Sequence, residues 1–526
     1  MRPISSVIAG LCAGLVLALG SSTVRGEVVT RVALLNGMQE TPPVSTTAKG
    51  CGRFVIDTDA NTLDFEIVYW GLSSAETAAH IHGMAGPGAP AGVIFPLPAG
   101  TVKRGTWNYA EAQEANILGG FTYVNIHSAN FGGGEIRGQI VAAVCDMDGG
   151  QEVPPNPSGG QGFGLFNIDP VAHTLSYYIA FTGLTAAETA CHIHGYAHHT
   201  VAAGIVHPLP LGGVKTGVWA YPAAEEQRII DGMTYVNIHS ANFGGGEIRG
   251  QIVTWLNPMN GARETPPNAT SSAGCAMISI NRGSNIMGHD IRVGFLTSPE
   301  TAAHIHGYAD AGVPAGVVQP LAAGARKLGT WTFGAANQNN ILLSRTYVNI
   351  HTMAFGGGEI RGQIWRGRPI PCSPLVTDQP DDFTATAPGF VHLMVMADER
   401  NGGPIQYEWR RNNVPVPNAP PFFGADTNML MISPSDPAHS GSYRCVMTNT
   451  CGTTVSDEAT VVVLPPCDPD VNCDGSINGF DIEATEQAVN GDFSNFCQAS
   501  ADLNGDGAEN GFDIETEEQR VNGAPC

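Results

Sequence analysis

The stretch Thr122–Ile140 reads TYVNIHSANFGGGEIRGQI, and it decides how the rest of the chain is divided. It returns unchanged at Thr234–Ile252 and with three substitutions at Thr346–Ile364, at an interval of 112 residues both times. An interval of that length is the size of a small domain and is too long for one solenoid repeat. The sequence therefore predicts three copies of one folding unit in tandem, and any function of the unit is expected three times.

Two shorter motifs keep the same register. His80-Ile-His82-Gly recurs at His192 and His304, and Glu40-Thr-Pro-Pro has counterparts that begin at Glu152 and Glu264. The register is thus maintained through each unit without a net insertion.

The pattern inside a unit is typical of short β-strands. Residues 62–70, TLDFEIVYW, alternate apolar side chains with Asp64 and Glu66, as expected of a half-buried antiparallel strand. Glycine and proline punctuate the remainder, and residues 110–118 form the only segment with the pattern of a short helix. The predicted fold class is mainly β, with tandem antiparallel β-sandwiches or Greek-key barrels.

These residues resemble a known family. The combination of AAHIHG, PAGV, Gly105-Thr106-Trp107 and TYVNIHSANFGGGEIRGQI is similar to the CHRD domain, named from chordin and also found in secreted bacterial proteins. The resemblance implies three extracellular β-domains of undefined biochemical role, at residues 27–144, 145–256 and 257–372, and it does not imply an enzyme.

Histidines are the residues of the unit whose side chains are best suited to form a functional site. Two histidines two positions apart on a strand leave the same face, and a third follows in the closing motif. Imidazoles from two strands could hold zinc or copper. The nine candidates are His80, His82, His127, His192, His194, His239, His304, His306 and His351.

A structural role is the alternative for these histidines. Hydrogen bonds to Glu135 or to a backbone carbonyl would order the core without a metal. The His-x-His pair is similar to a copper-binding pair of copper-zinc superoxide dismutase, but the sequence offers neither a bridging-ligand set nor an electrostatic funnel. The residues alone favour the structural role and leave the metal hypothesis, including a metalloenzyme, open.

The two ends of the chain differ in character. Residues 1–26 carry Arg2 and a short apolar run, the layout of a secretory signal peptide, so the mature protein is expected to be secreted, extracellular or attached to the cell surface. No later segment has the length of apolar sequence that a membrane helix requires. Fourteen Asp or Glu residues stand against one Arg in residues 467–526, so nucleic acid is excluded as a partner and multivalent cations are favoured.

Eleven cysteines remain after the predicted signal, which fits an oxidising compartment. Cys51 and Cys275 occupy equivalent positions, and we expect Cys51 to pair with Cys145 and Cys275 with Cys372. Cys191 is then the unpaired thiol.

Residues 373–465 have no counterpart in the repeats. Trp409, followed by Gly441-Ser442-Tyr443-Arg444-Cys445, resembles an immunoglobulin-type domain, with Tyr443 at the tyrosine corner. Leu393 and Val395 stand where the usual partner cysteine would be, which leaves Cys451 as the expected partner of Cys445.

The tail, residues 466–526, contains a repeat of its own at an interval of 32 residues. Each copy is a twelve-residue loop with oxygen ligands at positions 1, 3, 5 and 12, a glycine at position 6 and a helix-like segment after it, as an EF-hand-type calcium site requires. Four cysteines, Cys467, Cys473, Cys497 and Cys526, allow three pairings. The expected ligands of the two calcium ions are Asp470, Asn472, Asp474, Ser476, Asp481, Asp502, Asn504, Asp506, Ala508 and Asp513.

The duplicated loop resembles the type I dockerin, a calcium-dependent module that binds a cohesin. The resulting hypothesis is a secreted, non-catalytic modular binding protein that its tail attaches to a cohesin-like protein or a surface complex. A non-catalytic part of a polysaccharide-handling complex is a further alternative, although the sequence has no evident aromatic platform.

Overall fold

The computed structural model describes residues 28–369, 373–399, 404–449, 452–464 and 468–524. The chain divides into two compact units, Met1–Pro371 and Cys372–Cys526. The predicted signal peptide lies outside the described residues. Within the described ranges, no helix combines the length and the apolar character needed to cross a membrane.

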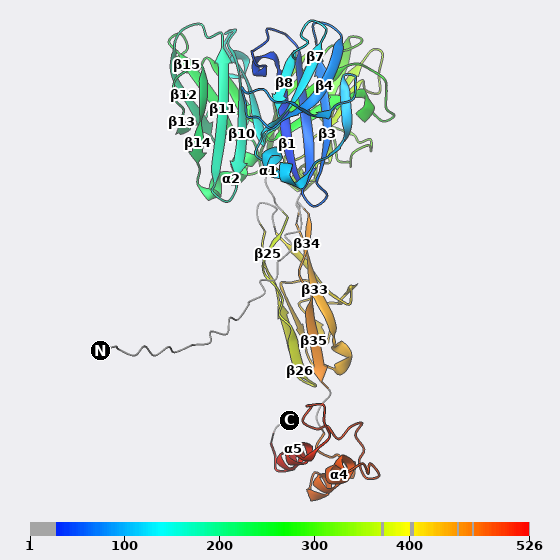
Figure 1. Ribbon diagram of the computed structural model, residues 1–526. Helices are drawn as coiled ribbons and strands as arrows, with labels where there is room; N and C mark the ends of the chain where they lie inside the picture. Colours follow the sequence, from blue (N-terminus) through cyan, green and yellow to red (C-terminus); the bar gives the residue numbers. More distant parts are fainter. Residues whose placement is uncertain (1–27, 370–372, 400–403, 450–451, 465–467, 525–526) are drawn as a thin grey trace, which may run out of the picture. The chain divides into compact units, whose positions relative to one another are not determined.

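Each repeat forms one eight-stranded antiparallel sheet with the same strand order. In Figure 1 the strands of the first repeat run from blue to cyan and those of the second from blue-green to green. In the first repeat the order is β5-β4-β7-β8-β1-β2-β3-β6. Its elements are β1 (Val28–Asn36), β2 (Lys49–Asp57), β3 (Thr62–Trp70), β4 (Glu76–Gly83), β5 (Val93–Pro96), β6 (Val102–Asn108), α1 (Glu114–Leu118), β7 (Thr122–Ser128) and β8 (Ile136–Gln139).

The other two repeats reproduce this arrangement. The second consists of β9 (Ala143–Asp148), β10 (Gln161–Asp169), β11 (Thr174–Thr182), β12 (Glu188–Gly195), β13 (Ile205–Pro208), β14 (Val214–Ala220), α2 (Glu226–Ile230), β15 (Thr234–Ser240) and β16 (Ile248–Ile252). The third consists of β17 (Trp255–Asn260), β18 (Ala273–Asn281), β19 (Ile286–Val293), β20 (Glu300–Gly307), β21 (Val317–Pro320), β22 (Arg326–Thr332), α3 (Gln338–Leu342), β23 (Thr346–Thr352) and β24 (Ile360–Gln363).

A sandwich-like core fills each repeat. The β1–β8 ladder is short, with Asn36 opposite Arg137, so it joins two four-stranded halves. Apolar side chains of both halves form one buried cluster that includes Leu63, Phe65 and Ile67 of β3. The predicted alternation of this strand is confirmed on its apolar face, and burying that face provides the main driving force for folding the repeat.

The three repeats also share a second core, which the sequence did not predict. Val32 and Leu34 of β1 turn away from their own sandwich and pack with Phe163 and Leu165 of the second repeat and Met277 of the third. Strands β1, β2 and their counterparts are therefore buried on both faces. We call the three repeats joined around this central core the head.

One disulfide crosses the central core and corrects the predicted pairing. Cys51 is bonded to Cys275, whereas Cys145 is buried and free. Cys51 and Phe163 are equivalent positions that both face the central core, so Cys275, the third such position, meets Cys51 there. Cys145 lies on β9 and faces the core of the second repeat, and it cannot reach Cys51. Cys191 is free, as expected, and Cys372 lies outside the described residues.

Buried ion pairs join the repeats around this core. Glu66 lies in β3 on the face expected to be solvated, but only 8% of it is exposed. It accepts hydrogen bonds from Arg104 of its own repeat at 2.5 Å and from Arg263 of the third repeat at 2.6 Å. Burial alone would raise the pKa of Glu66, but Arg263 and Arg104 outweigh it and lower that pKa. Between the second and third repeats, Arg292 of the third repeat forms comparable pairs with Asp146 and, at 2.8 Å, with Asp148 of the second.

The second unit begins with short strands that enclose a core of their own. The buried indole of Trp409 packs with Leu393, Val395 and Tyr443, and the Tyr443 hydroxyl donates to the carbonyl of His439 at 2.8 Å. That bond is the one predicted for a tyrosine corner, and the immunoglobulin-type resemblance stays a prediction. The strands are β25 (Leu375–Asp378), β26 (Phe383–Thr386), β27 (Val391–Met394), β28 (Met396–Asp398), β29 (Gln406–Arg411), β30 (Val414–Pro415), β31 (Phe422–Phe423), β32 (Met429–Ile432), β33 (Gly441–Thr448), β34 (Thr453–Val455) and β35 (Ala459–Leu464).

The expected disulfide of Cys445 is wrong. Cys445 is buried and free, and it stands directly opposite Trp409 on the neighbouring strand. Its side chain therefore faces the apolar interior and not the end of the hairpin, where Cys451 was expected to meet it. Cys451 lies outside the described residues.

The tail forms two helices that pack against each other, α4 (Gly479–Val489) and α5 (Gly511–Val521). Both predicted helical segments, residues 482–489 and 514–521, are confirmed, and each helix starts three residues earlier, at Gly479 and Gly511. A small cluster that includes Val471, Ala484, Ala488 and Phe496 forms the core. Cys473 is bonded to Cys497, which selects among the three predicted pairings, whereas Cys467 and Cys526 lie outside the described residues.

Candidate metal centres

The strand register brings the three histidines of a repeat to one face. β4 pairs with β7 so that Ala78 stands opposite His127, His80 opposite Asn125 and His82 opposite Tyr123. Residues opposite each other in an antiparallel pair point to the same side of the sheet, and so do residues two apart. Ile81 points the other way into the core. All three imidazoles therefore stand on the outer face of the sandwich.

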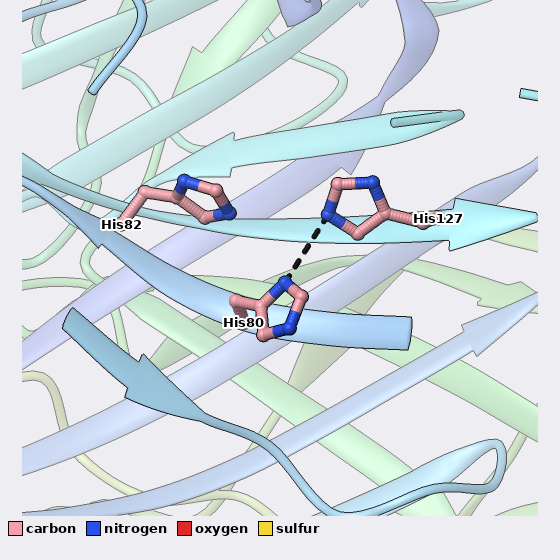
Figure 2. A group of neighbouring side chains, drawn as sticks. All are labelled: His80, His82 and His127. Carbon is pink, nitrogen blue, oxygen red and sulfur yellow. Dashed lines mark hydrogen bonds between the residues drawn. The ribbon is translucent and has the colours of Figure 1, made fainter. Parts of the chain in front are cut away.

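The three rings converge on a small space between them. Nδ1 of His80 lies 3.3 Å from Nε2 of His127. One ring nitrogen from each of the three histidines lies within 4.8 Å of the other two, and the same holds in the other two repeats. Figure 2 shows His82, His80 and His127 directed toward this common space. The structure thus brings together all nine histidines that the sequence singled out, in three equivalent groups.

Backbone carbonyls fix which nitrogen of each ring faces the space. Nδ1 of His82 lies 2.9 Å from the carbonyl oxygen of Ala91, and Nδ1 of His127 lies 3.0 Å from that of Gly132. A carbonyl only accepts, so both Nδ1 atoms carry the proton and both Nε2 atoms present a lone pair. The predicted bond to Glu135 does not occur, because Glu135 accepts hydrogen bonds from Thr46 and Ser73 instead.

An aromatic residue that the sequence did not single out holds His82 in place. The rings of His82 and Tyr123 are stacked at a centroid distance of 5.0 Å, and the Arg137 guanidinium lies 3.6 Å from the Tyr123 centroid. The Tyr123 hydroxyl accepts a hydrogen bond from the amide of Ala91, the residue whose carbonyl orients His82. The same stacking recurs at Tyr235 and Tyr347. The tyrosine belongs to the TYVNIH motif that all three repeats contain, but only the strand register reveals that it stacks on a histidine of the neighbouring strand.

The electrostatics favour the neutral form of His80 and His82. Desolvation and the neighbouring histidines lower the pKa of His80. Desolvation also lowers the pKa of His82 and outweighs the raising effect of the Ala91 carbonyl, while His127 and Arg137 add to the lowering. A neutral imidazole is the form that coordinates a metal ion.

A buried glutamate lies on the same face, and the sequence did not assign it a role. Glu40 is 6% exposed, and the Asn125 amide lies 3.4 Å from its Oε2. Glu40 Oε1 and Asn125 Oδ1 both lack a hydrogen-bond partner beside Gly134, where a Cβ atom would come within 2.7 Å and 2.3 Å of them. Desolvation raises the pKa of Glu40 to about 7, against the lowering charge of Arg137. A protonated Glu40 can therefore donate to Asn125.

This glutamate makes the head less stable as the pH rises. Because the pKa of Glu40 is about 7 in the folded chain and ordinarily 4.5, the folded state binds more protons between those values, and the free energy of unfolding falls with rising pH across that window. We expect Glu40→Gln to raise the free energy of unfolding at pH 8 by roughly 2 kcal/mol and to have little effect near pH 4.5. Denaturant titrations at the two pH values measure this difference. The exposed Glu111→Gln serves as control, and an equal effect of Glu40→Gln at both pH values would contradict the assignment.

The tail presents a different kind of metal centre, built from oxygen atoms. In the first loop, Asp470 accepts hydrogen bonds from the amides of Asp474 at 3.1 Å and Gly475 at 2.9 Å. Asn472 and Asp474 accept from the amides of Asp474 and Ser476, each at 2.9 Å. These bonds fold the loop tightly around its side-chain oxygens. Gly475, at position 6, has a φ of 87°, which a residue with a side chain rarely adopts.

The second loop repeats the arrangement. Asp502 accepts from the amides of Asp506 at 3.1 Å and Gly507 at 2.9 Å, and Gly507 has a φ of 84°. Asp481 and Asp513, at position 12, are both fully buried inside the first turn of their helices. Each accepts from an amide of its own loop, so the helix and the loop are tied together. Hard oxygen ligands arranged in this way suit calcium.

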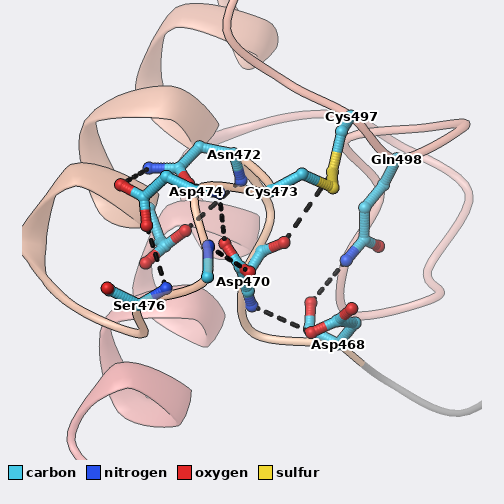
Figure 3. Close-up of a disulfide and its surroundings, with 10 residues drawn as sticks. Asp468, Asp470, Asn472, Cys473, Asp474, Ser476, Cys497 and Gln498 are labelled. Carbon is cyan, nitrogen blue, oxygen red and sulfur yellow. Dashed lines mark hydrogen bonds between the residues drawn. A yellow bond between two sulfur atoms is a disulfide. The ribbon is translucent and has the colours of Figure 1, made fainter.

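The Cys473–Cys497 disulfide fastens the first loop to the segment that follows α4. Figure 3 shows it beside Asp470, Asn472 and Asp474, three of the predicted ligands.

Helix α5 contains a buried acidic residue, Glu517, and desolvation raises its pKa to about 7. The burial of Glu517 was not anticipated, because its segment of the sequence has the pattern of a highly acidic helix.

Comparison with known proteins agrees with this geometry. The CHRD domain family model matches residues 31–140, 144–252 and 256–364, which together make up more than half of the chain. The chain therefore belongs to the CHRD domain family. The dockerin type I domain model matches residues 468–522. Among curated proteins, chordin of Xenopus laevis is 25% identical over 258 residues, which cover 43% of this chain and 27% of chordin.

Solved structures resemble parts of the chain only weakly. The titin M3 domain is 22% identical and covers 18% of this chain and 98% of its own, with a TM-score of 0.16. Tandem Ig repeats of Dlar are 14% identical and cover 35% of this chain and 90% of their own, with a TM-score of 0.17. Scores of this size do not establish a shared fold.

Proposed function

We propose that this chain is a secreted, non-catalytic binding protein whose tail attaches the three-repeat head to a cohesin-type partner in the presence of calcium. The main support for this proposal comes from the tail. Its two loops each offer side-chain oxygens at positions 1, 3, 5 and 12 around a glycine of positive φ, and the dockerin type I model matches the same residues. Dockerin type I domains bind cohesins, which makes a cohesin the partner class to test.

Calcium would act on the tail through charge as well as through coordination. Fourteen acidic side chains against one Arg in residues 467–526 repel one another when no cation is bound. Two calcium ions would return four positive charges to the places where the carboxylates are most crowded. Because position 12 belongs to the helix, binding would also fix each helix to its loop.

The tail also offers a surface for the partner. Phe480 and Phe512 occupy equivalent positions at the starts of α4 and α5, and each is 66% exposed. Large exposed aromatic side chains are enriched at the centres of protein interfaces. The two rings are thus the residues expected to contact the cohesin.

Binding of the intact chain to immobilised type I cohesins tests this function. We expect binding in calcium, its loss in chelator, and its loss in the double variant Asp470→Ala/Asp502→Ala. The double variant Phe480→Ala/Phe512→Ala should weaken binding at least tenfold while calcium uptake stays unchanged. Binding to cohesins that persists equally in chelator, or no binding to any of them in calcium, would overturn the proposal.

A further inference from the structure

Each histidine group of the head contains a ring nitrogen without a hydrogen-bond partner, at the equivalent position in all three repeats. Nε2 of His82, His194 and His306 has no hydrogen-bond partner, and each of these residues is at least nine-tenths buried. In the third repeat, Nδ1 of His304 and Nε2 of His351 have none either. A buried polar atom without a hydrogen-bond partner costs free energy. The same cost recurs at the equivalent position of all three repeats, and this recurrence needs an explanation.

The geometry of these nitrogens matches that of a bound metal ion. Two nitrogens at 2.0 to 2.1 Å from one tetrahedral ion lie roughly 3.3 Å apart. Nδ1 of His80 and Nε2 of His127 are separated by 3.3 Å, and so are Nδ1 of His192 and Nε2 of His239. The third ligand atom of each group lies within 4.8 Å of both, so a modest inward movement of one ring completes the site.

We propose that each repeat of the head binds one divalent transition-metal ion, of the zinc class, through its three histidines. The ligands in the first repeat are Nδ1 of His80, Nε2 of His82 and Nε2 of His127. Neutral nitrogen donors prefer zinc, cobalt, nickel or copper over calcium, which prefers oxygen. The head and the tail therefore bind different metals. The proposal for the head does not depend on the proposed attachment of the tail to a cohesin.

The surroundings of the rings are those of a metal site. The carbonyls of Ala91 and Gly132 hold the protons of His82 and His127 on the far side of the rings, as second-shell acceptors do for zinc-bound histidines. Tyr123 fixes the ring of His82 by stacking. His80 and His127 are partly exposed, so the fourth position of the ion faces water and is open to a further ligand.

Titration of the intact, metal-stripped chain with Co²⁺ and Zn²⁺ tests the proposal. The experiment is run in excess calcium, which fills the acidic loops of the tail. We expect three ions per chain, a visible absorption of four- or five-coordinate Co²⁺, and a higher melting temperature with Zn²⁺. Each of His82→Ala, His194→Ala and His306→Ala should remove one ion of the three, by weakening the affinity of its site at least a hundredfold.

Matched variants separate the sites from adventitious binding. His173→Ala changes a partly exposed histidine of the second repeat that lies outside its group, so it should retain three ions. His127→Gln, at a more exposed ring, is the second test should His82→Ala unfold in the absence of metal, and it should also leave two ions. A stripped chain that takes up no Co²⁺ or Zn²⁺, or a His127→Gln chain that still binds three ions, would overturn the proposal.

Discussion

Replacing both Cys51 and Cys275 by alanine is expected to lower the free energy of unfolding of the head by up to about 5 kcal/mol. The disulfide joins residues 224 positions apart, and on the chain-entropy model closing so long a loop removes much of the conformational freedom of the unfolded chain. It also links the first and third repeats inside the central core, where Cys51 is fully buried. Denaturant titration of the oxidised protein and of the double variant measures the difference.

The control for this prediction is Cys145→Ala. Cys145 is equally buried but free, and the equivalent position of the first repeat is Ala33, so we expect a loss of only about 1 kcal/mol. Non-reducing peptide mapping supplies an independent check. A disulfide between Cys51 and Cys145, or equal effects of the two sets of variants, would contradict the structure of the central core.

Removing calcium is expected to destabilise the tail by about 5 kcal/mol while the head is unaffected. Two sites, each at a free calcium concentration of a hundred times its dissociation constant, stabilise the folded state by about 2.7 kcal/mol apiece. The expected ligands at position 12, Asp481 and Asp513, lie in the first turns of α4 and α5, so both helices should lose protection when the ions leave. Amide hydrogen exchange of the intact chain, with calcium and with chelator, locates the change.

The matched control keeps calcium present and changes the ligands. Asp470→Ala/Asp502→Ala should show in calcium the exchange pattern that the unchanged chain shows in chelator. Asp492→Ala, at an exposed acid outside the loops, should behave like the unchanged chain. Protection of α4 and α5 that does not depend on calcium would contradict the assignment of the loops.

Much of the fold follows from local patterns in the sequence. The 112-residue interval predicted three equivalent sandwiches, the alternation of residues 62–70 predicted β3, and the duplicated loop of the tail, with a helix-like segment after each copy, predicted α4 and α5. The shared face of His80 and His82 also follows from their spacing, because side chains two apart on a strand point the same way. Each of these features depends on contacts within a few residues or on repetition.

The features that sequence reasoning missed depend on contacts between residues far apart in the sequence. Glu66 has the pattern of a solvated residue on an alternating strand, and only its contact with Arg263 of another repeat explains its burial. Cys51 pairs with Cys275 for the same reason, since periodicity cannot show that a second face of a strand is covered. The hydrogen bond from the ring of His82 to the carbonyl of Ala91 similarly requires the path of a loop, which spacing does not reveal.

Calcium titration of the intact chain tests the central claim of this account most directly. We expect two ions to bind to the unchanged chain, Asp470→Ala and Asp502→Ala each to remove one of them, and the double variant to bind none. A chain that binds no calcium, or a double variant that still binds two ions, would contradict it.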